Sequence, residues 1–173
     1  MESTISRRNF LKVSALSGGG MLVSFSLLNE VSAAMPMEEA VFTPNIYIKI
    51  CSSGTIVLMA PNPEIGQGVK TSLPMIIAEE LCVDWKKIQV ELAPLDSKFG
   101  RQTAGGSGSI RGRFTELRTL GATAREMLVS AAAQTWNVQR AECTAEDGFV
   151  MHKASGRKLS YGELAAKAAT LEV

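Results

Sequence analysis

The sequence predicts an α+β fold, in which a small mixed sheet with two hairpins packs against helices, one of them long. Two segments alternate apolar and polar residues around tight turns, which is typical of β-hairpins. Two other segments repeat apolar residues at helical spacing, and the longer of them spans about residues 110–136. Apolar residues make up 46% of the 173-residue chain, which is enough for a hydrophobic core.

The first predicted hairpin lies within residues 45–60. Residues 45–51 alternate as a strand does, with one side formed by Ile46, Ile48 and Ile50. The turn Ser52-Ser53-Gly54 leads to a second β-rich run at residues 55–60. The Pro-Asn-Pro sequence at 61–63 ends that run, because proline cannot donate to a strand ladder.

A helix and a strand follow this hairpin. Residues 69–81 carry apolar side chains at helical spacing: Leu73, Ile76, Ile77 and Leu81. Residues 87–92 then alternate as a short strand. The order from residue 45 to residue 92 is therefore strand, strand, helix, strand.

The long helix has an apolar stripe that contains several small residues. Its members are Ile110, Phe114, Leu117, Gly121, Ala124, Leu128, Ala132 and Trp136. The small residues predict close approach of a neighbouring element at this face.

A second hairpin is predicted over residues 142–154, around the favoured turn pair Asp147-Gly148. His152, the only histidine, would lie on a surface strand there, so we expect no metal ligand. Ser160 and Glu163 form the pattern of a capping box, which predicts a short helix to about residue 169.

Charge and cysteine content exclude several classes of protein. The formal net charge is +1, and no basic patch indicates a nucleic-acid partner. Three cysteines without a CxxC pair argue against an iron–sulfur or zinc site in this chain. Cys51 and Cys82 lie in apolar stretches, so we expect buried free thiols.

The N-terminus has the parts of a twin-arginine export signal. Arg7-Arg8 precedes a glycine-weakened apolar segment at residues 13–28, and Val31-Ser32-Ala33 is a small-residue cleavage site. The apolar run is too short and too rich in glycine for a spanning helix. We therefore predict a signal peptide at 1–33, a linker at 34–44 and one domain at 45–173, with delivery to the periplasm or the periplasmic face of the inner membrane.

Two glycine-rich loops precede predicted helices, at Gly66-Gln67-Gly68 and at residues 105–109. A helix N-terminus offers free N–H groups and a positive dipole end, which suit a phosphate. Neither loop has the spacing of a Walker or dinucleotide-binding motif. Each loop by itself is more often simply a tight turn, whereas two such loops in one small domain make a phosphate-bearing ligand as plausible as tight turns.

The two loops carry a family resemblance. The sequence PEIGQGVKT at 63–71, followed by IAEEL at 77–81, resembles the xanthine dehydrogenase and aldehyde oxidase family. The sequence GSGSIRG at 106–112 is similar to the second cofactor loop of that family. The resemblance is greatest to the molybdopterin-binding large subunit of the isoquinoline 1-oxidoreductase type, and it extends from about residue 45 to residue 171.

The resemblance implies a cofactor and the residues that contact it. The cofactor is a molybdopterin dinucleotide with molybdenum, usually in its cytosine form. The implied cofactor-binding residues are Gly66, Gln67, Gly68, Gly108, Ser109, Ile110 and Arg111. Well-known members have a small residue at the place of Arg111, so its charge either pairs with a phosphate or lies on the helix surface.

The resemblance also implies an activity and partners. The full enzyme would oxidise an aldehyde or hydroxylate an N-heterocycle, with water as the oxygen source. The 2Fe-2S clusters would lie on a small partner subunit, and a cytochrome c is a candidate electron acceptor. The catalytic glutamate of the family lies in a later part of the large subunit, so we expect no catalytic residue and no activity in this chain alone.

A different class of function stays open. The chain would then be a small exported binding module, or a truncated non-catalytic remnant, that holds a phosphorylated ligand. An incomplete domain should expose an unpaired sheet edge and an apolar face, whereas a self-sufficient module should not.

Overall fold

The computed structural model describes residues 39–171, so the predicted signal peptide and residues 34–38 of the predicted linker lie outside the described part. One sheet has four strands in the order β1 (Val41–Asn45), β2 (Ile48–Cys51), β3 (Ile56–Ala60) and β4 (Ile88–Leu92). A second sheet has three strands, β5 (Cys143–Glu146), β6 (Phe149–His152) and β7 (Arg157–Ser160). The helices are α2 (Val69–Leu81), α3 (Ser109–Trp136) and α4 (Tyr161–Ala168). The predicted α+β class, both hairpins and the long helix are confirmed.

The four-stranded sheet changes from antiparallel to parallel pairing at β3. Strands β1, β2 and β3 pair antiparallel, whereas β3 and β4 pair parallel. Helix α2 makes the crossover that a parallel pair requires. As a consequence, the carboxyl ends of β3 and β4 lie at the same edge of the sheet, and each continues into a glycine-rich loop.

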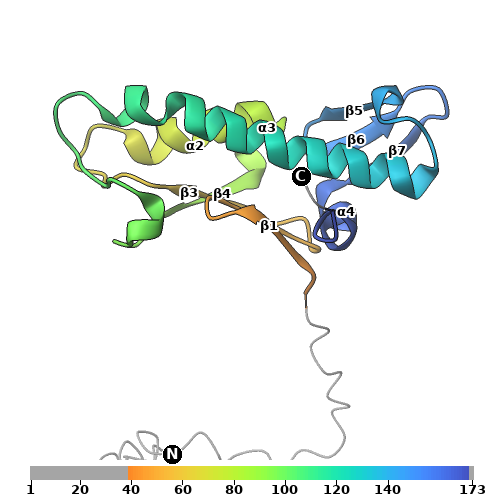
Figure 1. Ribbon diagram of the computed structural model, residues 1–173, viewed down its shortest axis with the longest axis horizontal. Coiled ribbons are helices and arrows are strands. Elements are labelled where there is room, and N and C mark those ends of the chain that lie inside the picture. Colours follow the sequence, from red (N-terminus) through yellow and green to blue (C-terminus); the bar gives the residue numbers. More distant parts are fainter. Residues whose placement is uncertain (1–38, 172–173) are drawn as a thin grey trace, which may run out of the picture. The chain divides into compact units, whose positions relative to one another are not determined.

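Helices α2 and α3 lie against each other over this sheet, and α3 continues to the three-stranded sheet (Figure 1). The predicted close approach on α3 is found at Gly121, where an added Cβ would lie 2.7 Å from the carbonyl oxygen of Ile77. The side chains of Leu73, Ile77, Leu117 and Leu128 are fully buried in the same core. The small residue therefore allows two helix backbones to touch while larger residues fill the space beside them.

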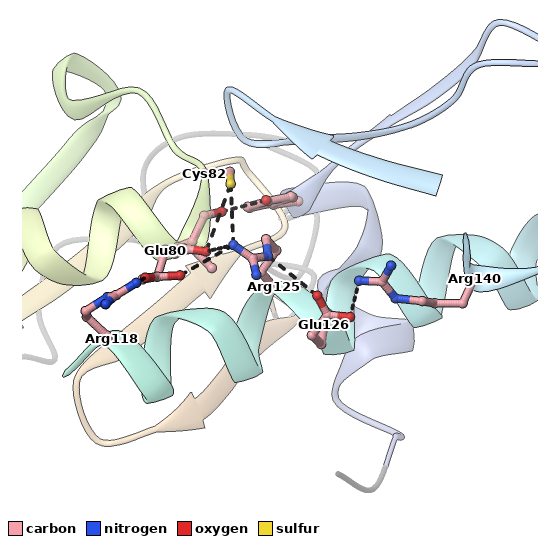
Figure 2. A network of polar contacts seen from close by, with 8 residues as sticks. Glu80, Cys82, Arg118, Arg125, Glu126 and Arg140 are labelled. Atoms are coloured by element: carbon pink, nitrogen blue, oxygen red, sulfur yellow. Dashed lines mark hydrogen bonds and ion pairs between the residues drawn. The ribbon is translucent and has the colours of Figure 1, made fainter. Parts of the chain in front are cut away.

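A chain of charged groups joins α2 to α3 (Figure 2). The Glu80 carboxylate accepts from Arg118 Nε at 2.6 Å, and Arg125 Nη1 donates to the Glu80 carbonyl at 2.6 Å. Glu126 pairs with Arg125 and with Arg140. Arg125 Nη1 also lies 3.7 Å from Cys82 Sγ. These contacts fix the C-terminal turn of α2 against the middle of α3.

The second hairpin turns at Asp147 and Gly148, both with positive φ (50° and 81°), as a two-residue turn of the predicted kind requires. Strand β7, which the sequence did not predict, adds a third strand to this sheet. The predicted capping box is present, since Ser160 and Glu163 exchange side-chain and backbone hydrogen bonds. The Tyr161 hydroxyl donates to the Leu81 carbonyl at 2.7 Å and joins α4 to the end of α2.

Several expectations need correction. Residues 41–44, assigned to the linker, belong to β1. Local sequence could not predict that this segment pairs with β2. The predicted strand over 45–51 is interrupted, because Ile46 and Tyr47 form the turn between β1 and β2; Ile46 is 40% exposed there, whereas Tyr47 is buried. Cys82 is only partly buried, because it caps α2 in a left-handed conformation.

His152 does not lie on a surface, because only 5% of it is exposed. Its ring packs near Trp136, and its two nitrogens contact Glu142 at 2.9 Å and Ser155 at 2.7 Å. This histidine is therefore a hydrogen-bonded part of the small sheet.

Several large apolar side chains of the described part are exposed. Leu95 is 92% exposed and Ile65 is 72% exposed. The first two apolar residues of the α3 stripe, Ile110 and Phe114, are also exposed. Strand β4 pairs only with β3 among the described strands. In residues 39–171, no helix combines the length and the apolar character that a membrane crossing needs.

Candidate functional site

The two glycine-rich loops come together because they leave adjacent parallel strands at the same edge. Gln102 Nε2 donates to the carbonyls of Pro61, after β3, and Pro94, after β4, at 3.0 and 2.9 Å. Asn62 Nδ2 donates to the Thr103 carbonyl at 2.9 Å. Ligands of open sheets with parallel strands bind at this carboxyl edge. The topology therefore places both predicted loops where a ligand site is expected.

The first loop is held by its own side chains. The Glu64 carboxylate accepts from the backbone N–H groups of Gly66 (2.7 Å), Gly68 (3.0 Å) and Lys70 (2.9 Å). These bonds, above all those from Lys70 and Gly68, hold the pKa of Glu64 below its ordinary value. In this conformation a carboxylate already occupies the anion position at the start of α2.

Gln67 also serves its own loop. Its Oε1 accepts from the Ile65 N–H at 2.6 Å, and its Nε2 donates to the Pro63 carbonyl at 2.9 Å. The first loop is thus a fixed, exposed turn that offers its backbone and shape, while the polar ends of Glu64 and Gln67 are in use.

The second loop is different, because the start of α3 has no internal cap. The N-cap residue Gly108 provides no side-chain hydrogen bond, and the first turn contains no acidic residue. Here lies a pocket of about 440 Å³. Its lining residues are Asn62, Arg101, Thr103, Gly105, Gly106, Gly108, Ser109, Arg111, Gly112 and Arg113. Free N–H groups, a positive dipole end and guanidinium groups are the features that favour binding of an anion.

Arg113 builds the wall of this pocket. It is only 9% exposed, and its guanidinium donates to the carbonyls of Phe99 and Arg101 and to the hydroxyl of Tyr47. It also pairs with Glu116 at 2.9 Å. Its charge is therefore engaged in holding residues 99–101 against α3, whereas Arg101 and Arg111 lie exposed beside the pocket.

One polar atom at the pocket wall has no hydrogen-bond partner among residues 39–171. Asn62 is 4% exposed, and its Oδ1 is buried without a hydrogen bond. A buried acceptor without a donor is unfavourable and calls for a reason in the native molecule. Donors in the pocket therefore suit a phosphate, and this orphaned acceptor suits a ligand group with an N–H bond.

The sequence identified only part of this pocket. Of the residues implied by the resemblance, Gly108, Ser109 and Arg111 line it, whereas Ile110 and the Gly66–Gly68 loop do not. The residues that sequence reasoning missed are Asn62, Arg101, Thr103 and Arg113. Asn62 alone carried a local signal, since it lies two residues after the end of a buried strand.

The described residues contain no group of three His, Cys, Asp or Glu side chains placed to hold a metal ion. The pocket lining instead offers backbone N–H groups, hydroxyl groups and guanidinium groups.

Known proteins resemble this chain in sequence. Isoquinoline 1-oxidoreductase subunit beta of Brevundimonas diminuta is 33% identical over 174 residues, which cover 94% of this chain and 22% of that protein. A membrane-bound aldehyde dehydrogenase [pyrroloquinoline-quinone] of Gluconacetobacter polyoxogenes is 29% identical over 171 residues, which cover 96% and 22%. The chain thus spans about a fifth of the length of these relatives.

Solved structures share the fold. Quinoline 2-oxidoreductase from Pseudomonas putida 86 aligns with a TM-score of 0.53 at 18% identity, and CO dehydrogenase from Oligotropha carboxidovorans with 0.54 at 20%. Each alignment covers 69% of this chain and 15% of the other. Residues 18–173 match the family described as the molybdopterin cofactor-binding domain. With the two loops at one sheet edge and a match over most of its length, the chain belongs to the molybdopterin cofactor-binding domain family.

Proposed function

We propose that this chain is the N-terminal part of a molybdenum hydroxylase large subunit and that the pocket at the start of α3 holds a phosphate of the molybdopterin dinucleotide. The observation that carries the proposal is the uncapped N-terminus of α3, flanked by Arg101 and Arg111, in a chain of this family. The start of α2 does not compete for the phosphate, because Glu64 occupies it.

Each loop would have its own task. The N–H groups at the start of α3, that of Ser109 among them, and the Arg111 guanidinium would bind phosphate oxygens. The Gly66–Gly68 loop would approach the cofactor through its backbone, since its polar side chains hold the loop in shape. We propose that the nucleotide of the cofactor is cytosine, as the family resemblance implies.

When bound, the molybdenum cofactor supplies a two-electron oxidation in which water is the source of oxygen. The proposed substrates are an aldehyde or an N-heterocycle, which the names of the relatives support. The role of this chain is to bind and orient the cofactor, and we assign no catalytic residue to its described part. We expect no turnover from the purified chain by itself; stoichiometric molybdenum with turnover would contradict this.

The proposal includes partners and a location. The exposed residues Ile65, Leu95 and Phe114, together with the free edge of β4, support contact with further polypeptide of the large subunit. A small 2Fe-2S subunit would receive the electrons, and a cytochrome c is the proposed acceptor after it. The Arg7-Arg8 signal supports export of the folded, loaded protein to the periplasm.

Binding of pyrophosphate tests the site. Titration calorimetry would compare the full chain with Arg111→Gln and Arg101→Gln, because glutamine keeps hydrogen-bonding capacity but removes the charge. We expect each change to weaken binding about fivefold to tenfold, as loss of one charged hydrogen-bond donor does. Lys153→Gln, at an exposed position outside the pocket, is the matched control and should have no effect. Equal affinities for all four proteins would place the anion elsewhere.

A further inference from the structure

We infer that Asn62 is a specificity-determining residue, whose Oδ1 accepts a hydrogen bond from an amino group on the heterocycle of the bound ligand. The inference rests on the proposed function, because it concerns the same pocket. The ligand class is then a phosphate joined to an aminated heterocycle, and a phosphate alone satisfies only part of the site.

The orientation of the Asn62 amide is fixed by its neighbour. Nδ2 donates to the Thr103 carbonyl at 2.9 Å. If the amide were turned over, Oδ1 would face that carbonyl, and two acceptors would meet. The amide therefore keeps Oδ1 away from Thr103, where it has no partner in the described part of the chain.

Other groups at the pocket do not meet this need. The Ser109 hydroxyl is directed at the same Thr103 carbonyl, at 3.5 Å. Arg113 uses its donors on Phe99, Arg101, Tyr47 and Glu116. Arg101 and Arg111 extend along the exposed side of the pocket, where an anion is expected. The acceptor at Asn62 is thus left for a donor that arrives with the ligand.

The size of the pocket agrees with a ligand larger than phosphate. Its volume of about 440 Å³ lies within the usual range of small-molecule sites. A site built to form a hydrogen bond rejects analogues that lack the matching group, because its own polar atom then stays unpaired. Asn62 would therefore distinguish aminated rings from rings without the amino group.

A matched pair of ligands tests this on the unaltered chain. Cytidine 5′-monophosphate and zebularine 5′-monophosphate differ only in the 4-amino group of the ring. 6-Hydroxymethylpterin and 6-hydroxymethyllumazine form a second pair, with an amino and an oxo group at the same ring position. We expect the amino member of one pair to bind about tenfold more tightly than its partner. Discrimination within the cytidine pair would identify the nucleotide as the group that Asn62 contacts, and discrimination within the pterin pair would identify the pterin.

Variants assign the effect to Asn62. Asn62→Leu has similar volume and no acceptor, so it should abolish the preference for the amino member within each pair, whatever loss of the Nδ2 bond to Thr103 does to overall affinity. Gln89→Leu removes an exposed amide outside the pocket and should keep the preference. A preference that persists in Asn62→Leu overturns the inference.

The two proposals fail in different ways. If neither pair discriminates while pyrophosphate binding depends on Arg111, the role of Asn62 is wrong and the phosphate site stands. If pyrophosphate does not bind at all, the proposed site fails, and the inference about Asn62 fails with it.

Discussion

Gly121 of α3 lies directly against the carbonyl oxygen of Ile77 in α2. A Cβ at Gly121 would approach that oxygen to 2.7 Å and the Glu80 Cβ to 3.1 Å. This contact between two backbones sets the position of α3, the helix whose start lines the pocket. The glycine thus connects the packing of the core with the geometry of the site.

Gly121→Ala should destabilise the protein by about 1–3 kcal/mol, because the methyl group forces two helix backbones apart. Gly112→Ala is the control on the same helix, since a Cβ there meets nothing within 4 Å. The control should stabilise by about 0.5–1 kcal/mol, as alanine does in a helix. Urea unfolding measures both; equal effects of the two changes would contradict the close contact.

Arg113→Met should lower the free energy of unfolding by about 2–4 kcal/mol, because it leaves carbonyl groups of residues 99–101 without their charged donor. We also expect pyrophosphate binding to weaken, since Arg113 holds the backbone that carries Arg101. Arg118→Met is the control: its side chain is 54% exposed, so loss of its ion pair should cost about 1 kcal/mol or less. Thermal unfolding measures the effect on stability, and calorimetry measures the effect on pyrophosphate binding. A small effect of Arg113→Met in both would show that residues 99–101 do not depend on Arg113.

The first glycine loop should lose its order in acid. Backbone donors hold the pKa of Glu64 below its ordinary value of 4.5, so the folded state favours the carboxylate. Its contribution is complete above the unfolded pKa and is lost as the pH falls through the folded pKa. NMR shifts of the Gly66, Gly68 and Lys70 amides should therefore stay constant from pH 7 to about pH 5 and move together at lower pH. Glu64→Gln should remove this shared titration, and its persistence in the variant would exclude Glu64 as the cause.

Tyr161→Phe should destabilise the protein by about 1–2 kcal/mol, because the Leu81 carbonyl loses its buried donor. The hydroxyl donates at 2.7 Å, and burial raises the pKa of Tyr161 far above its ordinary range. Thr119→Val, which removes an exposed hydroxyl from α3, should change stability by less than about 0.5 kcal/mol. If both variants unfold at the same denaturant concentration as the parent chain, the Tyr161 bond contributes nothing.

Local sequence was sufficient for most elements. The apolar spacing of residues 69–81 predicted the bounds that α2 has, because that spacing is the pattern of a helix buried on one side. Asp147-Gly148 and the Ser160–Glu163 pair act through neighbours two or three positions away, so a turn and a cap could be read directly from them. Strand β7 was missed, since its four residues are too few to show a period.

The sequence by itself determined the helices, the hairpins, the two glycine-rich loops and the family resemblance, because each depends on residues close together in the chain. Only the tertiary structure decided which residues line the pocket at the start of α3, since Asn62 and Arg101 come to it from other segments. The contact between Asn62 and Thr103 spans 41 positions, and it exists only because β3 and β4 pair parallel and release both loops at one edge. Residues brought together in this way leave no periodic pattern or motif in the sequence, since their proximity results from strand pairing and helix packing over long separations.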